Sequence, residues 1–198
     1  MALRHGGAFT LCIIAVLAQG CAGLTRNGAD TMTWNCRPEE LDVQLNGAPV
    51  ARIRLPELAG TGPPEVTREP LGNGWNRVRM AWELVRPVAQ DEVSATFDLA
   101  FEPDFWWAPH LAPRNGDCIG QHVFRSPAIV ACRDDLIFVV VPDLDLVGRD
   151  GPWFLDYDAR ERRVWLGMSE ARPYAHVLYE KQPGLRLEQG RVEMGFYA

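Results

Sequence analysis

The sequence predicts an all-β protein, an antiparallel β-sandwich of about ten short strands that follows an N-terminal signal segment. Apolar residues recur at every second position in most segments, which is the period of a strand with one face in a core. Turn signals separate these segments, and the 198 residues include 18 Gly and 15 Pro. The sequence lacks the alternating strand and helix patterns that mark a parallel α/β sheet.

Residues 1–20 predict an export signal. Arg4 and His5 give a basic start, and residues 8–18 form an apolar run. The run has the length of a secretory-signal core, about 7–15 residues, and is too short for a membrane-spanning helix of about 20. We therefore expect the mature protein outside the cytoplasm, in the cell envelope or in the extracellular medium.

A cysteine follows the apolar run where a lipid could be attached. Gly20-Cys21 resembles the end of the lipobox of bacterial lipoproteins. Acylation of Cys21 would anchor the chain to a membrane, because each buried methylene contributes about 0.8 kcal/mol. Ordinary cleavage near residues 22–23 is the alternative. Residues 21–39 are then expected to form a tether, and residues 40–198 one sandwich domain.

The first predicted element of this domain is a hairpin. Residues 41–45 alternate in polarity, and residues 49–55 return as the second strand. Asn46-Gly47 between them is a strong hairpin signal, because both residues tolerate positive φ. Residues 59–74 contain several Gly and Pro, so we expect a loop there.

Two longer segments follow with the same period of two. Residues 77–85 and 93–101 alternate in polarity, and we expect them to pair as neighbours through a turn at residues 87–91. Residues 102–121 predict irregular structure. Residues 136–141 are continuously apolar, which predicts a central strand buried on both faces.

The other strands of the C-terminal half are expected at residues 128–132, 153–157, 163–166, 175–179 and 192–197. Residues 153–157 and 163–166 are predicted to form a hairpin around residues 158–162. The last still alternates in polarity where the sequence stops at Ala198. Either this strand pairs inside the sheet or the sequence is cut from a longer protein, and the second explanation is favoured.

Composition excludes one class of partner. With 20 basic and 26 acidic side chains the net charge is −6, and no basic stripe is present to overcome repulsion from phosphates. The sequence therefore predicts no nucleic-acid binding.

The cysteines predict at most one disulfide bridge. Cys36, Cys118 and Cys132 remain after the signal segment, and no spacing typical of a zinc site occurs. An oxidising compartment permits a Cys118–Cys132 bridge, because the two flank a short segment. Three buried thiols are the alternative.

The aromatic-rich segment 105–127 is the most unusual stretch. Trp106 and Trp107 are adjacent, so on an extended chain one points into the core and the other outward. An exposed indole suits the apolar face of a sugar ring, which makes both tryptophans, with His110 and Arg125, carbohydrate-contact candidates. The alternatives are that both tryptophans fill the core and that Arg125 pairs with a buried carboxylate.

The sequence contains weaker signals for metal binding and catalysis. His110, Asp117 and His122 match no defined metal motif, and Cys118 with His122 lacks the signature of a nucleophilic pair. Asp143 and Asp145 project the same way and could hold calcium, or they could be turn residues at the rim. We predict no cofactor and no metal, and the sequence identifies no catalytic residue.

Residues 105–142 and the hairpin WFLDYD…WLGM resemble the N-terminal β-sandwich region of large secreted bacterial glycoside hydrolases, whose catalytic part is a following (α/α)6 six-hairpin barrel. The resemblance covers residues 40–198 and contains no catalytic motif. It implies a non-catalytic module that packs on a C-terminal catalytic domain, in an enzyme that acts on a polysaccharide.

Together these observations predict an exported, non-catalytic β-sandwich module associated with polysaccharide processing or carbohydrate binding. A lipoprotein of the cell envelope with a structural or protein-interaction role is the first alternative. A small glycoside hydrolase that uses two carboxylates is the second.

Overall fold

The computed structural model describes residues 30–107, 128–146, 153–169 and 185–198. The fold described below is that of the compact unit Thr31–Ala198. In the described ranges this unit is all-β, with fourteen strands that pair antiparallel. No helix in these ranges has the length and apolar character needed to cross a membrane.

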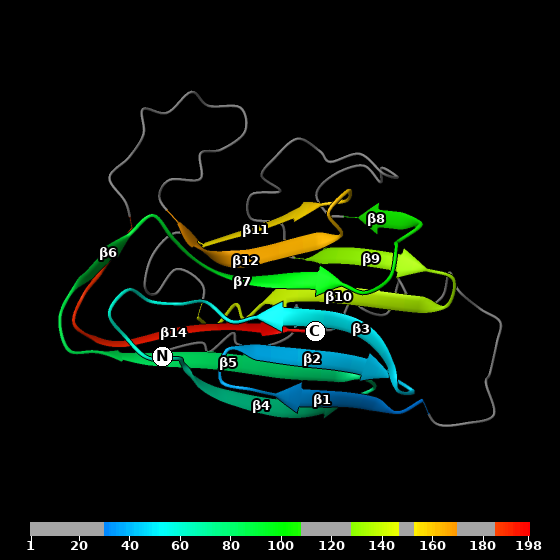
Figure 1. Cartoon of the computed structure of the whole chain (residues 1–198), viewed down its shortest axis with the longest axis horizontal. Coiled ribbons are helices and arrows are strands. Elements are labelled where there is room, and N and C mark those ends of the chain that lie inside the picture. The colour runs from blue at the N-terminus through cyan, green and yellow to red at the C-terminus, as the bar shows by residue number, and fades with distance from the viewer. Residues whose placement is uncertain (1–29, 108–127, 147–152, 170–184) are drawn as a thin grey trace, which may run out of the picture. The chain divides into compact units, whose positions relative to one another are not determined.

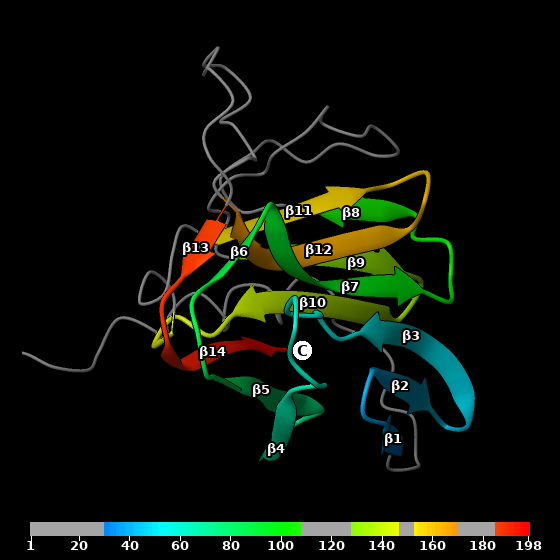
Figure 2. The same ribbon diagram turned by 60° about the vertical axis from the view of Figure 1, so that its left-hand side comes forward.

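Two six-stranded sheets form the sandwich, as predicted (Figures 1 and 2). The strands of the first sheet are, in spatial order, β1 (Met32–Cys36), β2 (Glu40–Leu45), β3 (Ala48–Arg54), β7 (Glu92–Leu99), β12 (Arg163–Ser169) and β11 (Trp153–Asp158). Those of the second are β4 (Glu65–Gly72), β5 (Trp75–Leu84), β14 (Gly190–Tyr197), β10 (Leu136–Pro142), β9 (Ile129–Arg133) and β8 (Phe105–Trp107). A short pair, β6 (Val88–Gln90) and β13 (Leu185–Leu187), lies beside them.

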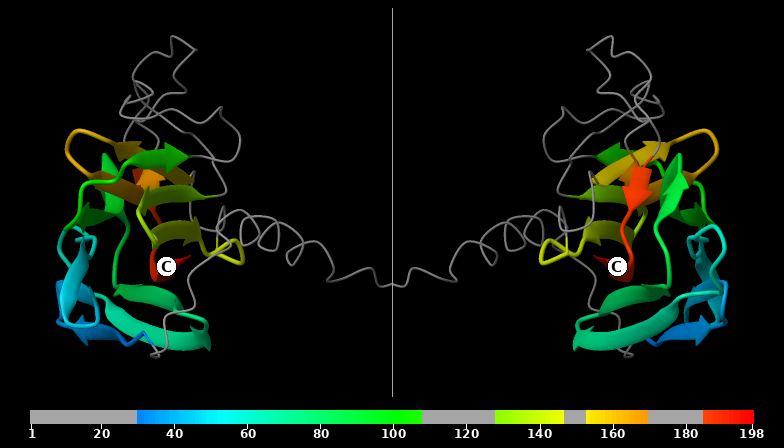
Figure 3. Two further views of the ribbon diagram at one scale, coloured as in Figure 1. Left: turned by 90° about the vertical axis from the view of Figure 1, so that its right-hand side faces the viewer. Right: turned by 90° about the vertical axis from the view of Figure 1, so that its left-hand side faces the viewer.

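The core lies between the two sheets, which Figure 3 shows from the side. Each strand sends alternate side chains inward, and in β7 every second residue from Val93 to Leu99 is buried. Phe97 of the first sheet meets Phe196 of the second edge to face, with ring centroids 4.8 Å apart. Trp106 of β8 stacks on Tyr157 of β11 at 5.0 Å, again across the two sheets. These aromatic contacts join the layers.

Both predicted hairpins are confirmed. Strands β2 and β3 are joined by Asn46 and Gly47, whose φ angles of 52° and 80° are those of a type I′ turn. Strands β11 and β12 pair from Trp153 with Met168 to Asp158 with Arg163. The turn residues mark both hairpins in the sequence, whereas the register of β2 against β3 shifts by one residue at a bulge between Val43 and Gln44.

The expected pairing of residues 77–85 with 93–101 is wrong. Strand β5 pairs with β4 and β14 in the second sheet, whereas β7 pairs with β3 and β12 in the first. The link between them contains β6, which pairs with β13 and carries the chain from one sheet to the other. Both strands have one apolar face, and both apolar faces lie in the core between the sheets. Alternating polarity is the same whether two strands pair side by side or lie in opposite sheets, so it could not distinguish the two arrangements.

The expected loop at residues 59–74 ends in a strand. Strand β4 pairs with β5 through a turn at Asn73 and Gly74, whose φ angles are 52° and 82°. Only Val66 in β4 is even partly buried. A strand at the edge of a sheet with no buried face has no apolar alternation, which is why the periodicity missed it.

Two further expectations need correction. The segment expected as a tether contributes β1, which pairs with β2 from Met32 to Cys36. Strand β10 is inside its sheet, as predicted, but it is not buried on both faces: Ile137 is 50% exposed, and Val139 is only partly buried. Its outward positions are apolar without being covered. The strand expected at residues 175–179 lies outside the described residues.

Candidate functional site: a groove on the first sheet

The outer face of the first sheet carries a row of alternating charges that crosses five strands. Cross-strand register places Asp42 opposite Arg52, Arg52 opposite Asp98, Asp98 opposite Arg163, and Arg163 opposite Asp158. We call these five residues the charged row. Opposite charges that face each other across strands stabilise a sheet, and here each arginine lies between two carboxylates.

A second row, one pleat further along the same face, is less uniform. It consists of Glu40, Arg54, Thr96, Trp165 and Asp156, again in register across β2, β3, β7, β12 and β11. Trp165 is the aromatic member of this row, and it is partly exposed. An indole thus stands among charged and hydroxyl side chains on an outer sheet face.

A groove of about 640 Å³ lies over this second row. It is mainly polar, and the lining includes both strand residues and the turn between β1 and β2. The residues that line it are Arg37, Pro38, Glu39, Glu40, Arg54, Leu55, Pro56, Glu57, Ser94, Thr96, Arg163 and Trp165. We call it the Trp165 groove. Its volume is in the range of small-molecule sites, about 300–1,000 Å³.

Asp98 holds two arginines at the edge of the groove. The Arg54 Nη2 donates to Asp98 Oδ2 at 2.7 Å, and the Arg163 Nε donates to Asp98 Oδ1. Arg54 belongs to β3 and Arg163 to β12, so one carboxylate on β7 fixes donors from both neighbouring strands. The Arg163 guanidinium also lies 5.8 Å from the centre of the Trp165 ring, within cation–π range.

These groups are suited to binding a polyol. The indole offers an apolar surface, the hydroxyls of Ser94 and Thr96 can donate or accept, and each guanidinium has five N–H donors of which the ion pair uses one or two.

No family model, no curated protein and no solved structure matches this chain. The functional inference therefore depends on the groove and on the fold.

The two tryptophans singled out from the sequence take opposite orientations, as expected. The Trp106 side chain is 1% exposed and stacks on Tyr157, so it leaves no ring face for a ligand. Trp107 is partly exposed on the outer face of the second sheet, opposite Val130. Of this pair only Trp107 remains a contact candidate, and it lies on the other sheet from the Trp165 groove.

The other predicted site residues are mostly outside the described ranges. These are Cys21, His110, Asp117, Cys118, His122 and Arg125. Cys132 lies in β9 and is partly buried, and its carbonyl accepts a hydrogen bond from the Asp104 amide at 2.8 Å. The Cys118–Cys132 bridge stays a prediction.

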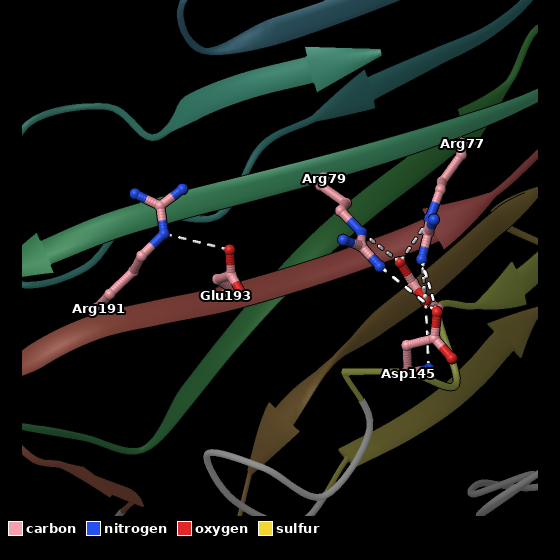
Figure 4. A network of polar contacts seen from close by, with 6 residues as sticks. Arg77, Arg79, Asp145, Arg191 and Glu193 are labelled. Carbon is pink, nitrogen blue, oxygen red and sulfur yellow. Dashed lines mark hydrogen bonds and ion pairs between the residues drawn. The ribbon is translucent and has the colours of Figure 1, made fainter. Parts of the chain in front are cut away.

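Asp143 and Asp145 take part in a second polar cluster, on the outer face of the second sheet (Figure 4). Asp143 is fully buried, and its Oδ2 accepts from Arg77 Nε at 2.9 Å and from Arg79 Nε at 2.7 Å. Asp145 is exposed and accepts from Arg77 Nη2 at 2.8 Å. The two carboxylates do project the same way, and arginines hold both of them.

Backbone geometry brings Asp143 into this position. The Asp143 amide donates to the Gly195 carbonyl of β14 at 2.8 Å, and the Asp143 carbonyl accepts from the Leu146 amide at 2.9 Å, which closes a turn. A Cβ at Gly195 would lie 3.2 Å from the Cβ of Asp143 and 2.9 Å from the Val78 carbonyl, so glycine permits the approach. The turn interpretation of these aspartates is confirmed, and the cluster ties β10 to β14 and β5.

Tyr197 borders the same cluster. Burial raises the pKa of its phenol, and the negative charge of Asp143 raises that pKa further, while Arg77 opposes both effects. The Arg77 guanidinium lies 5.5 Å from the Tyr197 ring centre. Among the described residues no group of three or more His, Cys, Asp or Glu side chains is arranged to hold a metal ion.

Sequence reasoning identified the strand that carries Trp165 but did not identify the site. A signal was present, because Arg163 and Trp165 are two residues apart in a strand and so share its outward face. The groove forms only when β12 pairs with β7 and β7 with β3, and these partners are about 70 and 45 residues apart in the chain.

Proposed function

We propose that this chain is an exported, non-catalytic β-sandwich module that binds carbohydrate in the Trp165 groove. The observation that carries the proposal is the groove itself, in which a partly exposed indole stands among fixed arginines, hydroxyls and carboxylates. Sugar rings have an apolar face and a rim of hydroxyls, and this combination of groups matches both.

A binding role fits the groove better than a catalytic role. Glycoside hydrolysis needs two carboxyl groups placed on either side of a bond, one of which gives up a proton. Both oxygens of Asp98 accept hydrogen bonds from arginines, and Glu40 is paired with Arg37 at 2.9 Å. Asp98 and Glu40 are thus engaged in orienting cations, and Glu39 and Glu57, the other carboxylates at the groove, are placed to accept hydrogen bonds from sugar hydroxyls.

The wider setting of the proposal comes from the sequence. Export is proposed from the predicted N-terminal signal, and a membrane anchor would follow from acylation of Cys21. The resemblance to the front sandwich of secreted glycoside hydrolases suggests a polysaccharide or a C-terminal catalytic domain as partner. A module that holds a polysaccharide close to an enzyme raises the effective concentration of substrate.

Calorimetric titration of the full chain with a panel of oligosaccharides tests the proposal, with two tryptophan variants as the discriminating pair. Trp165→Ala removes a platform that a sugar ring covers over about 60–80 Å², which is worth about 1.5–2 kcal/mol and predicts a loss of about 10–30-fold in affinity. Trp107→Ala is the matched control, since it removes a partly exposed indole from the other sheet, and it should bind like the wild type. Binding that survives Trp165→Ala and is lost in Trp107→Ala would move the site to β8, and no binding to any glycan would end the proposal.

A protein-interaction role is the second candidate, and the outer face of β8, β9 and β10 favours it. Three of its outward side chains, Phe105, Ile137 and Val139, are apolar and not fully buried. An apolar face of this kind is typical of a contact with another domain or protein. Under this second function Ile137→Lys would abolish co-purification with a partner and leave the melting temperature within about 2 °C of the wild type.

A further inference from the structure

The charges around the Trp165 groove point to the class of its ligand. Resting on the proposed function, we infer that the groove takes an uncharged sugar chain and excludes acidic ones, and that Asp98 is the positioning residue that sets this selectivity.

Every arginine that lines the groove, and Arg52 beside it, already forms an ion pair with a carboxylate of the same face. Arg37 pairs with Glu40 at 2.9 Å and with Asp42 at 3.1 Å, and Arg52 pairs with the same two acids at 3.4 and 3.2 Å. Arg54 and Arg163 share Asp98. Three carboxylates therefore face four guanidinium groups across this surface.

Two further carboxylates shift the balance to the negative side. Glu39 and Glu57 line the groove, and neither forms an ion pair within the described residues. The lining residues alone balance, with three arginines and three glutamates, and the ion-pair partners Asp42, Asp98 and Arg52 bring the count to five carboxylates and four arginines, a net charge of −1. The groove is thus slightly acidic, although arginines are the most prominent donors in it.

This balance discriminates between glycans. A uronate or sulfated sugar would have to compete with Asp98, Glu40 and Asp42 for arginines that are already paired. It would also approach Glu39 and Glu57, which have no ion-pair partner in the described part of the chain. An uncharged sugar avoids both penalties, because its hydroxyls can accept from the unused guanidinium N–H groups and donate to Glu39 and Glu57. The paired charges then act as fixed hydrogen-bonding groups.

Asp98 controls both parts of this arrangement. It fixes the directions of Arg54 and Arg163, and it cancels one of their charges. Asp98→Asn keeps the size of the side chain and removes the charge, so the two arginines lose their orientation and the groove gains one unit of positive charge. The variant should therefore bind uncharged sugars less well and acidic sugars better.

The test is a set of titrations of the full chain with two families of probe. Uncharged gluco-, xylo- and manno-oligosaccharides form one family and oligogalacturonate the other, each measured at about 0.02 M and about 0.5 M salt. We expect binding in the uncharged family that changes less than about twofold between the two salt concentrations, and oligogalacturonate binding at least about tenfold weaker.

The variants separate a positioning role from a structural one. Asp98→Asn should weaken binding of the uncharged probe by about five- to tenfold and give measurable, salt-sensitive binding of oligogalacturonate. Glu83→Gln is the matched control, since it removes an acceptor of Arg191 at 3.0 Å on the other sheet, and it should change neither value. A simple loss of fold would lower both affinities together and would show in the melting curve.

The outcomes are distinguishable. Tighter and salt-sensitive binding of oligogalacturonate by the wild type would overturn the inference while leaving a carbohydrate-binding module. An Asp98→Asn variant that keeps the wild-type preference between the two probes would overturn the role of Asp98. Absence of binding to every probe would overturn the proposed function and the inference together.

Discussion

Replacement of Asp143 by Asn should destabilise the protein, and the structure allows the size of the effect to be worked out. Asp143 is 0% exposed, and its carboxylate accepts three hydrogen bonds from two arginines, at 2.9, 3.2 and 2.7 Å. The amide oxygen of Asn can keep part of this geometry, but the charge that makes these bonds strong is lost. Arg77 and Arg79 then keep the exposed Asp145 as their anionic partner in this cluster, in a partly buried site.

The size of the stability loss depends on how well water can solvate the two arginines in the variant. Breaking a fully buried ion pair by removing one partner costs about 3–5 kcal/mol, because the remaining charge is left unpaired. The side chains of Arg77 and Arg79 are 20% and 34% exposed, so water can solvate them in part. We therefore expect a loss of about 2–3 kcal/mol in the free energy of unfolding, which lowers the melting temperature by about 4–12 °C in a unit of this size.

Urea denaturation followed by tryptophan fluorescence measures this loss, and Asp145→Asn is the matched control. Asp145 contacts the same Arg77 at 2.8 Å but is 74% exposed, and an exposed ion pair contributes at most about 1 kcal/mol. Asp143→Asn should therefore be clearly the less stable of the two variants. A free energy of unfolding within about 0.5 kcal/mol of the wild type for Asp143→Asn would refute the view that this cluster ties the sheet together.

Two further predictions concern alkaline stability and backbone packing. Burial and the charge of Asp143 raise the pKa of Tyr197 in the folded state. The protonated phenol therefore contributes stability below the unfolded pKa of about 10, and this contribution is lost as pH rises through the folded pKa. Tyr197→Phe should make the melting temperature fall less steeply between about pH 9 and 11. A slope equal to that of the wild type would argue against this linkage. Gly167→Ala should lower the free energy of unfolding by several kcal/mol, because the new Cβ would lie 2.1 Å from the Val93 carbonyl oxygen. Gly47→Ala is the matched control: its Cβ would meet no atom within 4 Å, and it should cost only about 1 kcal/mol because of the positive φ. Similar losses for the two alanine variants in urea titrations would contradict the close approach of β12 to β7.

Local features of the fold could be predicted from the sequence, and long-range pairing could not. The Asn46-Gly47 turn and the alternation on either side of it specify the β2–β3 hairpin within about fifteen residues. By contrast, β5 and β7 have the same period and a short connection, and only the position of β6 reveals that the chain changes sheets between them. Alternation shows that a strand has a buried face and leaves open which sheet it joins.

Strand β4 shows a different limit. Its side chains are almost all exposed, so backbone hydrogen bonds with β5 hold it in place without apolar alternation. The turn at Asn73-Gly74 was the available signal, since both residues have positive φ.

The candidate site was missed for a related reason. Trp106 and Trp107 stand out in the sequence because they are adjacent, whereas Trp165 is a single aromatic residue in an ordinary strand. The Trp165 groove gathers residues of β2, β3, β7 and β12 and the turn before β2, and only the register between these strands places Arg54, Thr96 and Trp165 in one row. The charged row also cannot be predicted from the sequence, because it depends on the strand register that places Asp98 between Arg52 and Arg163.

Chemical-shift mapping by NMR tests the central claim, that the outer face of the first sheet binds sugar, most directly. The labelled full chain is titrated with the tightest uncharged oligosaccharide, and the indole N–H signals of the tryptophans are followed together with the amides of β7 and β12. We predict that the Trp165 indole and the amides near Ser94 and Thr96 shift in proportion to bound sugar while the Trp107 indole does not. Shifts confined to Trp107 and the outer face of β8–β10 would contradict the claim.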